Sequence, residues 1–328
     1  MDYADVILVA PDSFKGTLAA ADVARAIADG VREAGDEALE LPIGDGGEGT
    51  MDALLATLGG ELRSARVSDP LGRPVEARFA LLPDGRAVVE TAEASGFALL
   101  AEDERDPWAA STRGTGELIV EALKAGAGEI LVTVGGSATM DGGAGAIAAI
   151  DEAGVRPKLE VLCDVRLPFE RAPSVFGPQK GADARMVKRL ERRLDKLAAA
   201  APRDPRGVPM TAAAGALSGG LYAYCGAKLV AGAAYVLDTV GFDAHMRAAR
   251  AVITGEGRLD EQTLEGKAVG EVATRCRQAG VWCHAVVGQK ALDDFAVRLL
   301  DFASVHEAGT LDALHRVGYY VIREGGVT

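Results

Sequence analysis

The chain has 328 residues, 48% of them hydrophobic and 25% charged, which is typical of a globular protein and long enough to favour two domains. The formal net charge of −13 argues against a nucleic-acid-binding protein, because binding a phosphate backbone requires a basic face. An anionic ligand would have to be attracted by local lysines, helix N-termini or a metal ion.

The cysteines and the N-terminal segment bear on the cellular compartment in which the protein is expected. The four cysteines form no CxxC pair, which favours buried, reduced thiols (Cys163, Cys225, Cys276 and Cys283). Residues 1–5 carry acids where a signal peptide requires basic residues, and no apolar run reaches membrane-spanning length. We expect a cytoplasmic protein with no membrane partner.

The first sixty residues predict two β–α units. An apolar run at 6–10 leads into a loop at 11–16, and a helix with apolar residues at helical spacing begins near Thr17. A second run at 39–43 leads into a loop of glycines and acids at 44–49. The helix that follows is predicted from Thr50 to Leu58, because two glycines come next.

The sequence pattern changes in the middle of the chain, after the two β–α units. Residues 61–92 alternate polar and apolar residues between two Pro/Gly turn signals, which predicts an antiparallel meander. A helix is expected after residues 111–115. A strand at 130–134 then runs into the glycine-rich loop 135–143, and a short strand at 161–163 ends at Asp164.

Residues 184–201 predict one helix whose basic residues face solvent. The small residues of 212–220 indicate close backbone packing or a hinge. From about 245 the β–α rhythm returns, with strands at 251–254, 281–287 and 303–305. The predicted fold is α/β: a parallel-sheet, Rossmann-like domain (1–62 and 245–328) with a second mixed α/β domain (63–244) inserted into it. The active site is expected in the cleft between these domains.

The loops that follow these strands carry the residues expected to bind ligands, since open α/β sheets bind ligands beyond the carboxyl ends of their strands. The loop 135–143 is the densest candidate anion cradle, because small residues expose backbone N–H groups before a helix. A tight helix–sheet contact would also require small residues there. Lys180, held between Pro178 and Gly181, is placed to reach nucleotide phosphates.

The loop 11–16 lacks the Walker spacing of a P-loop. Its Lys15, flanked by Asp12 and Ser13, nevertheless suits a carboxylate or phosphate better than a plain surface position. The loop 44–49 matches the G-x-G-x-x-G spacing of dinucleotide-binding proteins. Because Asp45 and Glu48 would repel a pyrophosphate, a metal ligand or catalytic base fits them better, although Glu48 could also simply favour the first turn of a helix.

Further acids and cations suggest magnesium and substrate sites. Asp164 stands at the end of a strand, a common magnesium position. The stretch 255–267 combines three glycines with acids and cations, among them Glu256, Arg258 and Asp260. The four histidines share no motif, which argues against zinc, and Ser137 lacks the G-x-S-x-G context of a covalent nucleophile.

Seven blocks in one order resemble the bacterial glycerate kinase family: APDSFKG (10–16), GDGGEGT (44–50), STRGTGEL (111–118), GGSATMDGGAG (135–145), CDV (163–165), VFGPQKGA (175–182) and TGEGRLDEQTLEGKA (254–268). The resemblance covers nearly the whole chain. It implies two α/β domains and transfer of the γ-phosphoryl group of ATP to D-glycerate, usually at O2, giving 2-phosphoglycerate. The chain departs from the family pattern at Met140, where asparagine is usual, at Arg113, where an aromatic is common, and in a short segment between Ile150 and Val161.

Phosphoryl transfer requires that the protein position the two substrates and neutralise the phosphate charges. On this basis we hypothesise the following roles for the candidate residues. Mg²⁺ is assigned to carboxylates among Asp164, Glu256 and Asp260. ATP phosphates are assigned to the backbone of Gly135, Gly136 and Ser137 with Lys180 nearby. Glycerate is assigned to Ser13, Lys15 and Arg258, with Asp45 as the general base and Asp12 or Asp260 as alternatives.

Three alternatives remain open at this point. The chain could be a kinase of another small hydroxy acid, or a non-catalytic relative that binds a small acid or nucleotide. An NAD-dependent oxidoreductase that uses the loop at Gly44 is the third. A homo-oligomer is also open, because the sequence does not determine the oligomeric state.

Overall fold

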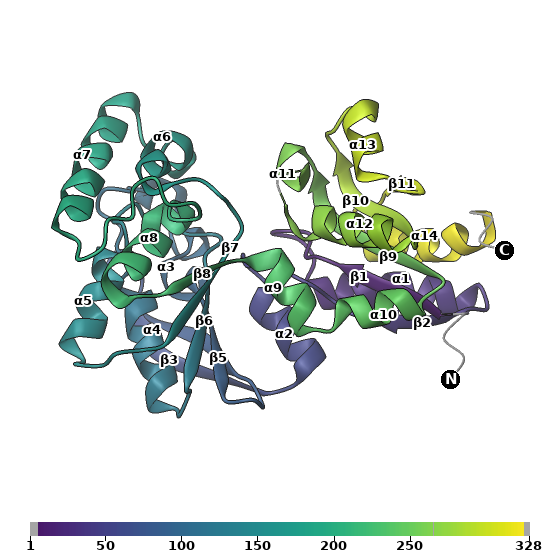
Figure 1. Ribbon diagram of the computed structural model, residues 1–328, viewed down its shortest axis with the longest axis horizontal. Coiled ribbons are helices and arrows are strands. Elements are labelled where there is room, and N and C mark those ends of the chain that lie inside the picture. Colours follow the sequence, from purple (N-terminus) through teal and green to yellow (C-terminus); the bar gives the residue numbers. More distant parts are fainter. Residues whose placement is uncertain (1–5, 265, 325–328) are drawn as a thin grey trace. The chain divides into compact units, whose positions relative to one another are not determined.

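The computed structural model describes residues 6–264 and 266–324, so the N-terminal residues 1–5 used above to argue against a signal peptide lie outside it, as does Glu265. The chain divides into two compact units (Figure 1). Unit 1 contains the chain up to Asp45, the segment Asp52–Thr57, and the chain from Ala233 onward. Unit 2 contains Gly46–Met51 and Leu58–Gly232.

Unit 1 is built on a five-stranded parallel sheet, in the order β11-β10-β9-β1-β2. The strands are β1 (Val6–Pro11), β2 (Glu37–Glu40), β9 (Ala251–Leu259), β10 (Trp282–Lys290) and β11 (Ser304–Glu307). This all-parallel sheet confirms the Rossmann-like prediction. The predicted strand 251–254 was too short, because β9 continues past Thr254 and pairs with β10 as far as Leu259. The predicted strand 39–43 was displaced, since β2 ends at Glu40, before Pro42.

Helices cover both faces of this sheet: α1 (Ala20–Glu33), α9 (Gly232–Thr239), α10 (Phe242–Ala248), α11 (Glu261–Leu264), α12 (Ala268–Ala279), α13 (Asp294–Leu300) and α14 (Leu311–Glu324). Successive strand residues point to opposite faces. On β10, Val286 belongs to the apolar cluster of α1 and α14, whereas Ala285 and Val287 belong to that of α12. The parallel strands are therefore buried on both sides, and their polar chemistry is confined to their ends.

Unit 2 is built on a six-stranded mixed sheet, in the order β3-β4-β5-β6-β7-β8. Strands β3 (Glu61–Ser68), β4 (Pro74–Leu81) and β5 (Arg86–Glu90) form the predicted antiparallel meander. From β5 onward, β6 (Glu129–Thr133), β7 (Leu159–Cys163) and β8 (Lys228–Ala231) pair in parallel. The prediction of a second, mixed α/β unit is confirmed.

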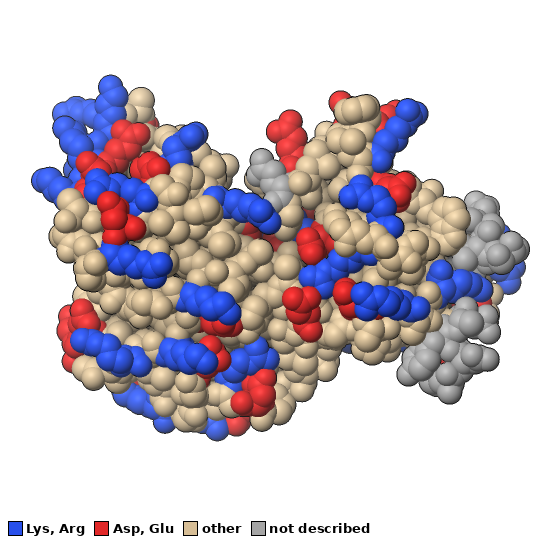
Figure 2. Space-filling model, in the orientation of Figure 1, with Lys and Arg blue, Asp and Glu red and all other residues tan. Residues whose placement is uncertain are grey.

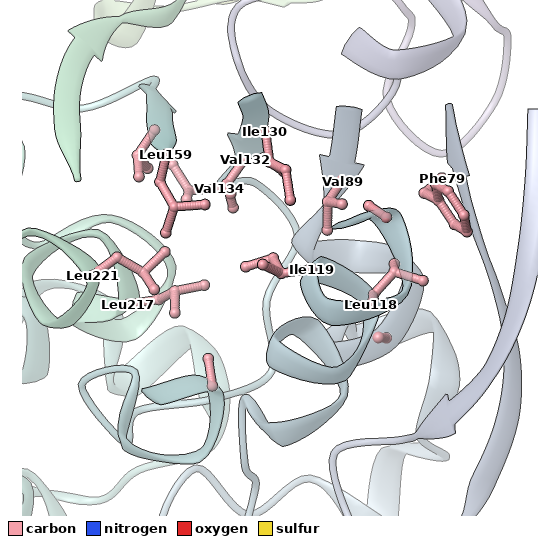
Figure 3. Packing of buried hydrophobic residues seen from close by; sticks show 14 of the residues in the cluster. Phe79, Val89, Leu118, Ile119, Ile130, Val132, Val134, Leu159, Leu217 and Leu221 are labelled. Carbon is pink, nitrogen blue, oxygen red and sulfur yellow. The ribbon is translucent and has the colours of Figure 1, made fainter. Parts of the chain in front are cut away.

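The helices of unit 2 are α3 (Thr91–Ser95), α4 (Arg113–Lys124), α5 (Ala144–Glu152), α6 (Ala172–Phe176), α7 (Ala184–Ala200) and α8 (Ala213–Cys225). Short 3₁₀ turns lie at η2 (Phe97–Leu99), η3 (Glu102–Glu104), η4 (Phe169–Arg171) and η5 (Pro178–Lys180). Helix α2 spans Thr50–Leu58, as predicted. Figure 3 shows the core: Leu118 and Ile119 of α4 and Leu217 and Leu221 of α8 lie against the apolar residues of the parallel strands.

The small-residue stretch at the start of α8 packs closely, as one of the two predicted alternatives required. Ala214, Gly215 and Ala216 have φ angles of +51°, +64° and +68°, a left-handed turn within the segment. A Cβ on Gly215 would lie 1.9 Å from the carbonyl oxygen of Thr139. The turn therefore supports the glycine-rich loop 135–143 directly, through backbone contact.

Over residues 6–264 and 266–324, no helix combines the length and apolar character that a membrane crossing requires.

Candidate active site

In unit 1, the loops that follow β1 and β9 enclose a cavity of about 340 Å³ at the carboxyl ends of these parallel strands. Three cations and three carboxylates contribute to its wall. The lining residues are Asp12, Ser13, Phe14, Lys15, Thr17, Glu256, Gly257, Arg258, Asp260, Lys267, Gly288, Gln289 and Gly309. Residues quoted from two distant motif blocks, 10–16 and 254–268, thus line one cavity.

The ammonium group of Lys15 donates a hydrogen bond of 2.9 Å to the carboxylate of Asp45. Asp45 follows β2, and its side chain is only 1% exposed, whereas that of Lys15 is 43% exposed. A lysine with this exposure can bind a second anion while it neutralises the buried carboxylate. The pair therefore joins the loop 11–16 to Asp45, and both belong to unit 1.

Two further buried carboxyl groups lie in this site. Burial, with the negative charge of Asp45, raises the pKa of Asp12 to about 8. Burial also raises the pKa of Glu256 to about 7, although a 2.6 Å hydrogen bond from Thr263 Oγ1 opposes the rise. Acids crowded in this way are favourable for binding a cation or for accepting a proton.

One buried polar atom in the cavity wall has no internal partner. The hydroxyl oxygen of Ser13 is buried and forms no hydrogen bond with the described residues. Buried hydroxyls are ordinarily hydrogen-bonded, so an orphaned hydroxyl in the wall of a cavity indicates a place where a ligand supplies the partner. This residue belongs to the predicted substrate set.

The predicted metal ligands do not form a ready-made cage in the described part of the chain, where no three His, Cys, Asp or Glu side chains are grouped to hold a metal ion. Glu256 and Asp260 lie in unit 1, and Asp260 contacts the Arg258 guanidinium at 3.7 Å. Asp164 lies in unit 2, directly after β7. Magnesium in phosphoryl-transfer sites is commonly held by one or two carboxylates together with substrate phosphates, a demand that Glu256 and Asp260 of unit 1 fit.

In unit 2, Lys180 is enclosed by the glycine-rich loop. Its ammonium group donates to Ser137 O at 2.7 Å, to Ser137 Oγ at 2.7 Å and to Thr139 O at 2.9 Å. Burial lowers the pKa of Lys180 to about 7, against the opposing charges of Asp141 and Asp164. An ammonium group has only three donors. Lys180 therefore holds the loop 137–139 in shape and places a positive charge beneath it.

The carboxylate of Asp141 organises the other end of this loop, a role that the sequence analysis did not assign. It accepts hydrogen bonds from the backbone N–H groups of Thr112, Gly143 and Gly145 and from the Thr112 hydroxyl. Asp141 is 1% exposed. The motif offered one signal for this role: an acid placed just before a helix can accept hydrogen bonds from the N–H groups at the helix start.

Three residues singled out in the sequence have local explanations. Met140 is fully buried and packs in the apolar cluster of Phe169, Leu190 and Leu194. Arg113 forms ion pairs with Glu117 and Glu152, which raise its pKa. Glu48 is exposed, and its carboxylate would lie 2.9 Å from a Cβ placed on Gly136.

Lys267 lies in the motif block 254–268 but was given no role from the sequence, and it contributes a third cation to the unit 1 cavity.

Cations and carboxylates at the carboxyl ends of parallel strands, with a glycine-rich loop before a helix, define an α/β enzyme that handles small anionic ligands. A family model described as the glycerate kinase family matches residues 7–156 and 149–312. A glycerate 2-kinase from Escherichia coli (strain K12) is 36% identical over 357 residues, covering 95% of this chain and 94% of that protein. A glycerate kinase from Bacillus subtilis (strain 168) is 40% identical, covering 89% and 87%.

The fold agrees with these relatives. A solved structure assigned to glycerate kinase 2 from Salmonella typhimurium LT2 superposes with a TM-score of 0.83 at 32% identity, over 98% of each chain. The chain belongs to the glycerate kinase family. It is therefore an enzyme of the phosphotransferase class, and the oxidoreductase alternative is set aside.

Proposed function

We propose that this enzyme transfers the γ-phosphoryl group of MgATP to O2 of D-glycerate and releases 2-phosphoglycerate. The observation that carries the proposal is the unit 1 cavity, which is lined by Lys15, Arg258 and Lys267 and by Ser13 with its orphaned hydroxyl. A volume of about 340 Å³ suits a small organic acid. Cations at this density can neutralise the carboxylate of glycerate despite the acidic charge of the whole chain.

The cavity supports specific roles for its lining residues and for Asp45, which contacts the lining residue Lys15. Lys15 and Arg258 would bind the glycerate carboxylate by charge-assisted hydrogen bonds, and Ser13 Oγ would pair with a substrate oxygen. Asp45 would accept the proton of the attacking hydroxyl, because its carboxylate is buried and held by Lys15 at 2.9 Å. Asp12, whose pKa is raised to about 8, and Asp260 are the alternative bases.

The glycine-rich loop of unit 2 supports the assignment of the nucleotide. The backbone of Gly135, Gly136 and Ser137 would cradle phosphate oxygens, and Lys180 would act through its positive charge beneath the loop. Mg²⁺ would be held by carboxylates among Asp164, Glu256 and Asp260, and it would neutralise charge on the phosphates during transfer. The crowding of Asp12, Asp45 and Glu256 in unit 1 favours a cation near them.

The test is a coupled assay of ADP release with a panel of short hydroxy acids, followed by product identification with phosphorus NMR. We expect D-glycerate to give the highest kcat/KM and 2-phosphoglycerate to be the product, with loss of turnover when Mg²⁺ is chelated. Formation of 3-phosphoglycerate would overturn the O2 assignment. A higher kcat/KM with another acid would overturn the substrate assignment.

The alternative of a non-catalytic relative is not kept, because the chain belongs to a family of phosphotransferases. Met140, the departure that raised this alternative, is buried in an apolar cluster and offers no hydrogen bond to a ligand.

A further inference from the structure

A groove of about 640 Å³ runs along α7 in unit 2, and no role has been given to it above. Its volume lies within the range of roughly 300–1,000 Å³ that is usual for small-molecule sites. The groove is lined by Trp108, Asp141, Ala144, Arg189, Arg192, Arg193, Lys196, Leu197 and Ala200. Asp141 and Ala144 belong to the glycine-rich loop and the start of α5, so the groove begins where that loop ends.

Four cations converge on this groove. On α7, Arg189 lies one turn from Arg193 and Arg192 one turn from Lys196, and Figure 2 shows Lys and Arg gathered over this helix. Within the described residues, none of the four has a carboxylate within 4.0 Å of its charged group. In a chain with 48 acids against 35 basic residues, four such cations together indicate selection for an external anion.

The charges of α7 are segregated around the helix. Glu191 and Asp195 line a different depression, which Arg192 also borders, and Arg206 pairs there with Asp195 at 2.9 Å. An ordinary solvated helix would mix its signs to form i,i+4 pairs. Here Asp195 pairs with Arg206 on one side of the helix, whereas Arg189, Arg193 and Lys196 line the groove on the other.

Contacts within unit 2 hold three of the guanidinium groups in place. Arg189 and Arg193 lie over the ring of Trp108, at 4.2 and 5.2 Å from its centroid, and Arg193 also donates to the Trp108 carbonyl at 2.8 Å. Arg192 donates to the Lys188 carbonyl at 3.2 Å. Stacking on an aromatic ring orders the arginine side chains before a ligand binds, so they lose less conformational entropy on binding. The one carboxylate in the wall, Asp141, is already bonded to four donors.

We propose that this groove binds a phosphorylated small molecule through Arg189, Arg192, Arg193 and Lys196, with Trp108 ordering the arginines. Multiple phosphate charges match four cations, and guanidinium groups suit phosphate oxygens because they donate in pairs. The phosphate groups could belong to either of two ligands. The first is the nucleotide, an assignment that rests on the proposed function. The second is a separate phosphorylated effector, an assignment that is independent of the proposed function.

The experiment uses tripolyphosphate as the probe and Trp108 as the reporter. The chain has two tryptophans, and Trp282 is 64% exposed in unit 1, so Trp282→Phe leaves Trp108 as the single emitter. Binding to the full chain is followed by Trp108 fluorescence and by calorimetry. Loss of two charge-assisted contacts in Arg189→Gln/Arg193→Gln is expected to weaken binding about tenfold or more.

The matched control is Arg185→Gln/Lys188→Gln, which removes the same charge from the same helix outside the groove. It is expected to bind tripolyphosphate within about twofold of the parent, because long-range charge effects are screened. Absence of tripolyphosphate binding, or equal weakening in both double variants, would overturn the proposal. Circular dichroism checks that α7 is retained in each variant.

Competition between ATP and tripolyphosphate then distinguishes the nucleotide from a separate effector, independently of the ADP-release assay. Displacement of tripolyphosphate by ATP, with ATP binding weakened in Arg189→Gln/Arg193→Gln alone, assigns the groove to the nucleotide. Simultaneous binding of ATP and tripolyphosphate assigns it to a free effector. Either result can be obtained from an inactive protein, so failure of the proposed function is distinct from failure of this site.

Discussion

Lys15 and Asp45 form a 2.9 Å ion pair in which the carboxylate is almost fully buried and the ammonium group remains partly open to solvent. The arrangement lets one lysine neutralise a buried acid and still contact a small anion in the cavity. Because Lys15 belongs to the first strand's loop and Asp45 to the second, both loops must be correctly placed for the pair to form.

Replacing Lys15 with methionine removes the cation next to Asp45. We expect KM for D-glycerate to rise about 10- to 100-fold, since a charge-assisted hydrogen bond to the substrate is lost. Steady-state kinetics across glycerate concentrations measures this. Lys124→Met, a change at an exposed lysine of α4, serves as the control and is expected to leave KM unchanged. Unchanged KM in Lys15→Met would remove Lys15 from the substrate site.

Asp45→Asn keeps the size of the side chain and removes its basicity. If Asp45 is the general base, kcat is expected to fall by about 10²–10⁴. Asp29→Asn, at an exposed position of α1, is the control. Should kcat in Asp45→Asn stay within a few-fold of the wild type, the base would have to be reassigned to Asp12 or Asp260, and each would be tested in the same way.

Lys180→Met leaves Ser137 and Thr139 without their shared donor. We expect the free energy of unfolding to fall by about 1–3 kcal/mol, because buried carbonyl groups lose their hydrogen bonds. Chemical denaturation at pH 7 measures the change. Lys188→Met on the exposed face of α7 provides the comparison, and equal stability of the two variants would contradict a structural role for Lys180.

The same lysine predicts a pH effect. Its folded pKa of about 7 lies below the unfolded value of 10.5, so the unfolded chain binds more protons between these pH values. The stability of the wild type relative to Lys180→Met is therefore expected to increase as pH rises from about 7 toward 10. A difference that is constant over this range would show that Lys180 keeps its ordinary pKa.

His284 predicts sensitivity to acid. Its Nδ1 lies 2.8 Å from Ser304 Oγ, while its Nε2 is buried without a hydrogen-bond partner in the described structure. Burial, with the charge of His306, lowers its pKa to about 4 from 6.5. Protonation is thus disfavoured in the folded state, and stability is expected to fall by on the order of 2–3 kcal/mol as pH drops from 6.5 toward 4. Thermal unfolding of the wild type and His284→Gln over this range tests it; parallel curves would exclude His284.

Met140→Asn introduces the residue that the family resemblance implies at this position of the glycine-rich block. Because position 140 lies among Phe169, Leu190 and Leu194, we expect a loss of about 1–3 kcal/mol from burying an unpaired amide. Met140→Leu keeps the apolar volume and is expected to cost less than about 1.5 kcal/mol. If Met140→Asn were as stable as Met140→Leu, the loop would have to rearrange to give the amide a partner.

Much of the fold followed from local pattern. The helix Thr50–Leu58, the strand that begins at Val6 and the meander after Glu61 were predictable, because apolar periodicity and flanking glycines act within a few residues. The boundaries of β2 and β9 were not predicted correctly. Whether a strand continues is decided by pairing with its neighbours, as β10 extends β9 to Leu259.

For the candidate site, the sequence alone determined the residue types: the lysines, acids and glycine loops, and their order in seven blocks that identify the family. Only the tertiary structure decided what each group contacts. It turned the donors of Lys180 inward onto Ser137 and Thr139, buried Met140 and collected four cations of α7 around Trp108. The physical reason is that hydrogen bonding, burial and charge pairing depend on neighbours that are distant in the chain, whereas composition and periodicity record only what is nearby.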